Sequence, residues 1–234
     1  MVEVGSWCVD KFEGSVNEQP DCTGRWINID KDSLSEEKNG VKKSGEILGK
    51  GAFACSTSNT KPARWITWFQ AATLCAKSGK QIIPDSVWVT AAMGTDKSKC
   101  TTDSLDTQMP STACKSQWGV FDMVGNVWEW TDAWVISGRT SLEKSGKPFD
   151  VASSKDGVWP AEYCDPKGIK CMDTVWGVNG EAGSGRDMIE GLPAATLRGG
   201  NFKMKEAAGV YSMTVNPAPA HFRETSGFRC AQPK

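Results

Sequence analysis

The first sixteen residues alternate between apolar and polar positions. Apolar side chains at Trp7, Val9 and Phe12 are separated by Cys8 and by charged residues. Such alternation is typical of a strand with one buried face. We therefore expect the chain to begin as a strand within a sheet.

Two later segments show the spacing of buried helices. In residues 67–79, Thr67 is a suitable N-cap, an apolar stripe follows at i, i+3, i+4 and i+7, and Gly79 stands where a glycine ends a helix. In residues 84–94, Pro84 begins a second helix and Gly94 ends it. The inward positions are Trp68, Ala71, Ala72 and Cys75 in the first helix, and Trp88, Ala91 and Ala92 in the second.

The remaining long segments have no clear period. Residues 29–60, 95–117 and 135–196 are polar or glycine-rich, and loops of this length inside a compact domain are usually functional or cross-linked. No internal repeat or interdomain linker is visible. One domain over 1–234 is the simplest prediction.

Composition and charge remove several classes of function. The chain has 234 residues and a net charge of −1, so nothing favours nucleic acid as a partner. No apolar run approaches bilayer length, so we expect no membrane insertion. The first residues lack a basic region followed by an apolar stretch, so a secretory signal is absent or has been removed.

The nine cysteines favour disulfides. Cys100 and Cys114 flank one polar loop, and Cys164 and Cys171 lie close together in another. Zinc and free thiols are the alternatives, but there is no Cys-x-x-Cys, and His221 is the only histidine. The odd number leaves at least one cysteine unpaired.

The segment from Gly119 to Trp130 reads GVFDMVGNVWEW. It resembles the signature of the formylglycine-generating-enzyme (sulfatase-modifying factor) superfamily, a branch of the C-type lectin-like fold. WCVDKFEGSV, the two predicted helices and LRGGNF…GFRCA resemble the other landmarks of that family, in the same order. The resemblance implies an α+β, C-type lectin-like fold with small twisted antiparallel sheets, two helices and long loops. It also implies a disulfide between Cys75 and Cys230.

Enzymes of this superfamily carry residues that the present sequence lacks. The formylglycine generators hold copper with a pair of cysteines, whose positions correspond approximately to Met204 and Gly209. Copper(I) selects soft thiolates, and no cysteine lies between Arg198 and Gly227. The related sulfoxide synthases need several histidines. We therefore predict that the chain is not an enzyme; the alternative is a divergent oxidase or metal-dependent relative.

A third group with this fold is similar over the C-terminal region. In the variable proteins of diversity-generating retroelements, error-prone reverse transcription rewrites one stretch of the protein at template adenines. Their pattern resembles Arg198-Gly199-Gly200-Asn201, Ala208-Gly209-Val210-Tyr211, Ala218-Pro219 and Gly227-Phe228-Arg229 in this chain. The resemblance implies that residues 202–226, called the tract below, form a variable ligand-binding surface.

The tract is rich in residue types suited to binding. Aromatic side chains and arginine are enriched where binding energy concentrates, and hydroxyl and amide groups supply adaptable hydrogen bonds. Many of its residues are reachable from AAC codons by mutation at adenine, whereas Lys203, Lys205 and Glu206 are not. The expected binding positions are Phe202, Lys203, Lys205, Glu206, Tyr211, Ser212, Thr214, Asn216, Pro217, His221, Phe222, Arg223, Glu224 and Thr225.

The resemblance also implies a metal site. Some relatives bind calcium with residues that correspond to Asp122, the carbonyls of Gly125 and Val127, and Glu129. Hard cations prefer such oxygen ligands. The alternative is that Glu129 and Asn126 only form hydrogen bonds with the loop backbone. No cofactor is required beyond a possible structural calcium.

Together these patterns predict a receptor or adhesin module. Its partner is expected to be a protein or cell-surface ligand. Disulfides without a visible signal fit a virion component or an extracellular protein. A structural lectin-like subunit without a variable ligand, or an ordinary surface without a partner, would also explain the tract.

Overall fold

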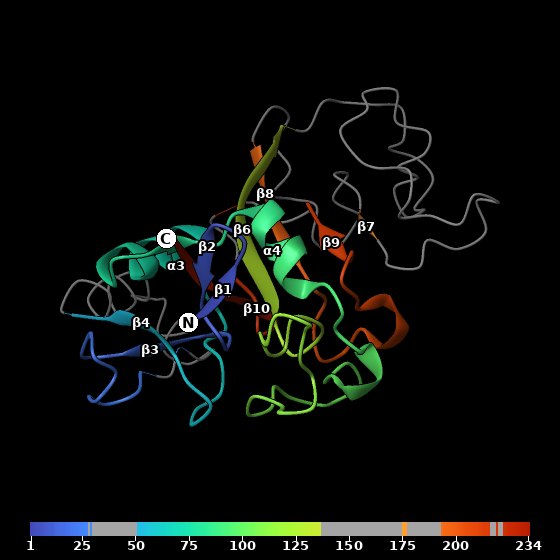
Figure 1. The fold of residues 1–234 in the computed structure, drawn as a ribbon, viewed down its shortest axis with the longest axis horizontal. Helices are drawn as coiled ribbons and strands as arrows, with labels where there is room; N and C mark the ends of the chain where they lie inside the picture. Colours follow the sequence, from blue (N-terminus) through green and yellow to red (C-terminus); the bar gives the residue numbers. More distant parts are fainter. Residues whose placement is uncertain (28, 30–50, 137–174, 177–192, 216–218, 220–221) are drawn as a thin grey trace, which may run out of the picture.

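The computed structural model describes residues 1–27, 29, 51–136, 175–176, 193–215, 219 and 222–234. In these residues two α-helices pack against small sheets, which confirms the predicted α+β class (Figure 1). No helix in the described ranges has the length and apolar character that a membrane crossing requires. The helices are α3 (Trp68–Lys77) and α4 (Asp85–Ala92); the strands are β1 (Val2–Val4), β2 (Trp7–Val9), β3 (Gly14–Asn17), β4 (Phe53–Ser56), β5 (Gln81–Ile82), β6 (Trp128–Ile136), β7 (Val175–Trp176), β8 (Pro193–Arg198), β9 (Met213–Thr214), β10 (Ser226–Phe228) and β11 (Cys230–Pro233).

The sheets connect the two ends of the chain. A four-stranded antiparallel sheet has the order β1-β2-β11-β5, so the C-terminal strand lies between β2 and β5. A five-stranded sheet has the order β10-β6-β8-β9-β7. Its β10–β6 and β7–β9 pairs are parallel, whereas its β6–β8 and β8–β9 pairs are antiparallel, as predicted for the sheets. Strands β3 and β4 form a separate antiparallel pair.

Both predicted helices are present. Thr67 caps α3 in a capping box with Gln70, and Gly79 follows the helix with φ of 70°. Pro84 precedes α4, as expected. The buried stripe of α3 differs slightly from the prediction, because Leu74 is fully buried while Ala72 is only half-buried.

The single strand predicted for residues 1–16 is wrong. The segment forms β1, β2 and the start of β3, with a turn at Gly5, where φ is 59°. Asp10 and Glu13 interrupt the alternation, yet both are buried. Their hydrogen-bond partners are distant in sequence, because the Asp10 carbonyl accepts from Arg229, and the Glu13 carboxylate accepts from Asn126 and from Val127 N.

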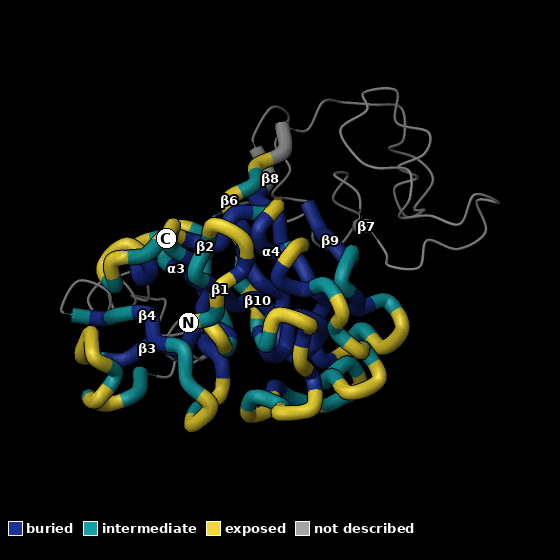
Figure 2. Tube along the Cα trace, in the orientation of Figure 1, coloured by how far each residue is buried: buried dark blue, intermediate teal, exposed yellow. Residues whose placement is uncertain are grey.

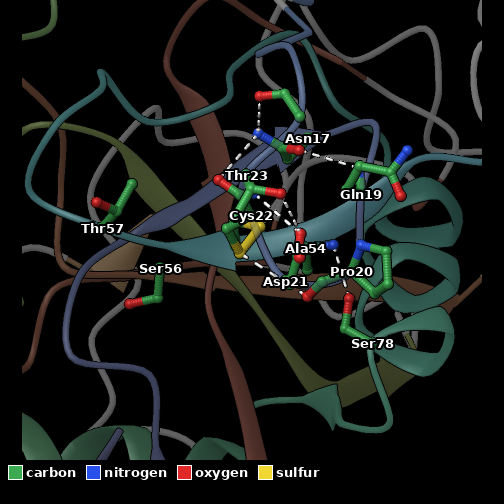
Figure 3. The surroundings of a disulfide bond; sticks show 12 residues. Asn17, Gln19, Pro20, Asp21, Cys22, Thr23, Ala54, Ser56, Thr57 and Ser78 are labelled. Atoms are coloured by element: carbon green, nitrogen blue, oxygen red, sulfur yellow. Dashed lines mark hydrogen bonds between the residues drawn. A yellow bond between two sulfur atoms is a disulfide. The ribbon is translucent and has the colours of Figure 1, made fainter.

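Three disulfides cross-link the described part of the chain. Two of them are the pairs named from the sequence, and the third joins Cys22 in a turn to β4. Figure 3 shows this turn, in which the Asn17 side chain accepts from Gln19 N (2.9 Å) and donates to Gly24 O (2.9 Å). The disulfides are Cys22–Cys55, Cys75–Cys230 and Cys100–Cys114; Cys8 is free, and Cys164 and Cys171 lie outside the described residues.

Buried residues concentrate in the centre of the molecule, and the loops carry most of the exposed ones (Figure 2). Trp88, Trp130 and Phe228 are fully buried. The indole of Trp130 donates to the carbonyl oxygen of Ile66 (2.9 Å), so the signature motif is tied to the segment before α3. The single-domain reading stays a prediction, because 137–174 and 177–192 are not described.

Candidate binding surface

The tract begins at an opening anchor, Arg198-Gly199-Gly200-Asn201, which is buried. The guanidinium of Arg198 makes two hydrogen bonds to the Asp85 carboxylate at the start of α4 (2.8 and 2.6 Å). Both glycines have positive φ, 92° and 86°. A Cβ on Gly200 would lie 2.6 Å from the Cβ of Ala208, so only glycine lets the chain turn here.

Asn126 of the signature motif holds the first residues of the tract. Its carbonyl oxygen accepts from Phe202 N (3.0 Å), and its own N–H donates to Thr101 O (2.7 Å). Its side chain accepts from Gln108 N (2.9 Å) and donates to the Glu13 carboxylate (2.5 Å). Asn126 therefore connects the N-terminal segment, the loop 100–114 and the tract.

The structure places three of the expected binding residues inside the protein. Phe202 is fully buried, and its carbonyl accepts from Ser104 N (2.7 Å). Ser212 is buried and donates to Ala207 O (2.5 Å), and Thr214 lies in β9 with 8% exposure. These side chains pack inside the protein in this arrangement, and their place in a binding surface stays a prediction.

The other described positions of the tract reach the surface. Lys203 pairs with Glu224, so the first and last parts of the tract meet. Lys205 lies 3.6 Å from the Asp103 carboxylate. Lys203, Lys205, Glu206 and Arg223 are exposed, Tyr211, Phe222, Glu224 and Thr225 are half-buried, and Asn216, Pro217 and His221 lie outside the described residues.

The second half of the tract follows the segment before α3. Trp65 N donates to Arg223 O (2.8 Å), and the Trp65 ring lies 6.5 Å from that of Phe222. Trp68 N donates to Pro219 O (2.9 Å). Only the backbone of the tract makes these hydrogen bonds, so its side chains can change without losing them.

The tract ends at a closing anchor, Gly227-Phe228-Arg229-Cys230, which is also buried. A Cβ on Gly227 would lie 2.6 Å from Val127 Cγ2, because β10 runs directly beside β6. The Arg229 guanidinium is fully buried and contacts the Glu129 carboxylate at 2.6 Å. Its other hydrogen bonds go to the carbonyl oxygens of Asp10 and Phe121 (both 2.9 Å).

The residues do not fit the calcium ion implied by the resemblance. Both oxygens of Glu129 are already in use, because Arg229 donates to each of them and Trp88 Nε1 donates to Oε2 (2.6 Å). A cation beside this carboxylate would face a buried guanidinium. Among the described residues, no group of three or more His, Cys, Asp or Glu side chains could hold a metal.

Burial also changes the protonation of two neighbouring carboxyl groups. Burial raises the pKa of Asp122 to about 7, although Ser111 N–H donates to it. Burial, together with the charges of Asp122 and Glu129, raises the pKa of Glu13 well above its ordinary value. The fixed charge of Arg229 thus balances Glu129, and the other two carboxyl groups favour their neutral forms.

Sequence reasoning missed the contribution of the loop between α4 and β6. Lys97 donates to Glu206 O (2.5 Å), and Lys205 N donates to Thr102 O (2.7 Å). In Figure 1 this green loop and the orange start of the tract lie together at one end of the molecule. In the sequence, only the cysteine pair that closes this loop could have indicated that the loop has a fixed place beside the tract.

A comparison with family models agrees with this arrangement of motif, anchors and tract. The model described as the sulfatase-modifying factor enzyme 1-like domain matches residues 99–234, more than half of the chain. The chain belongs to this family. The matched region contains the signature motif, both anchors and the whole tract.

The similar proteins include one chain that is much longer than this one. Serine/threonine-protein kinase Pkn1 of Chlamydia trachomatis serovar L2 is 29% identical over 105 residues, which cover 40% of this chain and 16% of the kinase. Among solved structures, Treponema denticola variable protein 1 is 17% identical with a TM-score of 0.45, covering 76% of this chain and 73% of that one. The Major Tropism Determinant P3c variant is 18% identical with a TM-score of 0.44, covering 71% of this chain and 37% of that one. The chain thus spans much less than two thirds of the kinase and of the tropism determinant.

Proposed function

We propose that this chain is a ligand-binding module whose tract is diversified by a retroelement. The observation that carries the proposal is the contrast between the anchors and the tract. The anchors are buried and allow no substitution at Gly200 or Gly227, whereas Lys203, Glu206 and Arg223 are exposed. A preformed backbone that displays replaceable side chains binds with little ordering cost.

The proposed partner is a protein or another cell-surface molecule. Exposed lysine, glutamate and arginine beside half-buried aromatic rings suit a protein interface, where charged rims surround apolar contacts. The three disulfides support a location in an oxidising environment, as a virion component or an extracellular protein.

Binding is favoured over catalysis because no cysteine stands at the two positions that correspond to the copper-binding pair. Met204 is half-buried against the core, and Gly209 is buried. We expect no formylglycine after aerobic incubation of the protein with copper and a cysteine-containing sulfatase peptide. Formation of that product would replace the binding proposal with an enzymatic one.

Sequencing the encoding locus in a population tests the diversification directly. A neighbouring near-copy of the tract-coding sequence, with variants only at its adenines, is the expected result. An invariant tract without a template nearby would remove the retroelement from the proposal. The pattern of variants would also identify which exposed positions are used.

A protein-level test compares exposed and buried positions of the same tract. Replacing Lys203, Glu206 and Arg223 together with serine should leave the free energy of unfolding within about 1 kcal/mol of the original, because exposed substitutions usually have small effects. Phe202→Ala should cost about 3–5 kcal/mol, because it empties a buried aromatic site. Similar losses in both variants would contradict the division into scaffold and display positions.

A further inference from the structure

Beside the tract, the loop 100–114 exposes an apolar side chain. Leu105 is 97% exposed, and Met109 in the same loop is 44% exposed. The Ser104 N–H donates to Phe202 O (2.7 Å). Leu105 is the residue after the donor, and Lys203 is the residue after the acceptor. This hydrogen bond holds the backbone next to the exposed Leu105 against the backbone next to Lys203, the first exposed position of the tract.

The backbone on both sides of Leu105 is held in place. Ser104 Oγ donates to Asp106 O (2.9 Å), and Gln108 Nε2 donates to the same carbonyl (3.0 Å). The Asp106 carboxylate pairs with Lys61 (3.2 Å) and with Arg64. The Cys100–Cys114 disulfide closes the loop. Little conformational entropy would be lost when such a loop meets a partner.

The same loop is bonded to the tract at further points. Lys205 N donates to Thr102 O (2.7 Å), the Lys205 ammonium lies 3.6 Å from the Asp103 carboxylate, and Lys97 donates to Glu206 O (2.5 Å). A partner that covers the exposed residues 203, 205 and 206 would therefore also come close to the loop that carries Leu105. In the sequence, Leu105 stands between Asp103 and Asp106, and each of these carboxylates pairs with a basic side chain, so charged groups lie on both sides of the leucine along the loop. A polar rim beside an apolar contact is typical of a protein interface.

We propose that Leu105 is a fixed apolar contact of the binding surface, which inserts into a pocket on a folded protein partner. The inference rests on the proposed function and narrows its partner to a protein. A protruding leucine offers no hydrogen bond, and it cannot enclose a small molecule, which needs a concave site on this chain. Only a partner that supplies the concavity can bury it.

The test uses a displayed library of the full chain, with positions 203, 205, 206 and 222–225 randomised, selected against hen lysozyme as the probe. In the selected binders, Leu105→Ser should weaken affinity about 10-fold to 100-fold, as expected for exposing one buried leucine again. Leu105→Met keeps an apolar side chain of similar volume, and should retain most of the affinity. Both variants should keep the original Tm, because the side chain is almost fully exposed.

Three other outcomes would overturn the inference, and they can be distinguished. Binders that lose less than about twofold on Leu105→Ser would remove Leu105 from the surface, while leaving the tract as the binding element. A correctly folded library that gives no binders would contradict the proposed function as well. If Leu105→Met weakened affinity as much as Leu105→Ser, burial of an apolar side chain would not explain the effect, and the inference would be wrong.

Discussion

Replacing Asn126 with alanine should destabilise the protein more than most single substitutions. The Asn126 side chain accepts from Gln108 N and donates to the Glu13 carboxylate. Truncation to alanine therefore removes the acceptor of the partly buried Gln108 N–H and one donor to the buried Glu13 carboxylate. Each such group costs about 1–3 kcal/mol. Asn126 also has φ of 50°, where alanine adds about 1–2 kcal/mol. The expected loss is about 3–8 kcal/mol in total.

Urea denaturation followed by fluorescence measures this loss, and Asn126→Gly separates its two causes. Glycine loses the same side-chain hydrogen bonds but accepts positive φ, so it should be more stable than alanine by about 1 kcal/mol. Amide exchange at Gln108 should accelerate in both variants, because its acceptor is gone. An alanine variant within about 1 kcal/mol of the original, or a glycine variant no better than alanine, would refute the reasoning.

Three further outcomes follow from the buried groups and the disulfides. Glu129→Gln leaves the Arg229 guanidinium without its countercharge and should cost about 3–5 kcal/mol in urea denaturation, whereas a smaller loss would mean that water reaches the pair. Because burial raises the pKa of Asp122 to about 7, the native state keeps a proton that the unfolded chain releases, so the free energy of unfolding should fall between about pH 4 and pH 7, by at most about 1.4 kcal/mol per pH unit. Asp122→Asn should reduce this dependence of the free energy of unfolding on pH. If the dependence were unchanged, a group other than Asp122 would be responsible for it. Replacing Cys75 and Cys230 with serine removes a disulfide whose cysteines are 155 residues apart, and should lower the free energy of unfolding by about 5 kcal/mol. Removing Cys100–Cys114, with a separation of 14 residues, should lower it by about 3 kcal/mol, and thermal unfolding compares the two variants.

Local patterns predicted the helices well because their signals lie within a few residues of each other. Thr67 and Gly79 mark the ends of α3, and both serve as expected. The N-terminal segment failed for the opposite reason. Glu13 is buried because Val127 N–H and Asn126 donate to it from more than a hundred residues away, and no local pattern records that.

The candidate site also combines features that the sequence indicates with features that depend on distant residues. The two anchors could be identified because their residues resemble the family pattern in order and spacing. The burial of Phe202 could not be predicted, since an aromatic residue at this place suits a surface as well as a core. Its burial depends on Asn126 and Ser104, which approach it from two other segments. Leu105 gave no signal, because a single leucine in a polar loop is ordinary in sequence.

The position of β11 has a consequence for how a ribosome makes this protein. β11 lies between β2 and β5, and its first residue forms the disulfide with Cys75. The N-terminal sheet therefore cannot close until synthesis has passed through the whole tract. A gene copy whose tract contains a frameshift or a stop codon would give a product without Arg229, Cys230 and a central strand. If the tract is diversified as proposed, folding itself would act as proofreading, because only copies that keep the reading frame through it yield a complete molecule.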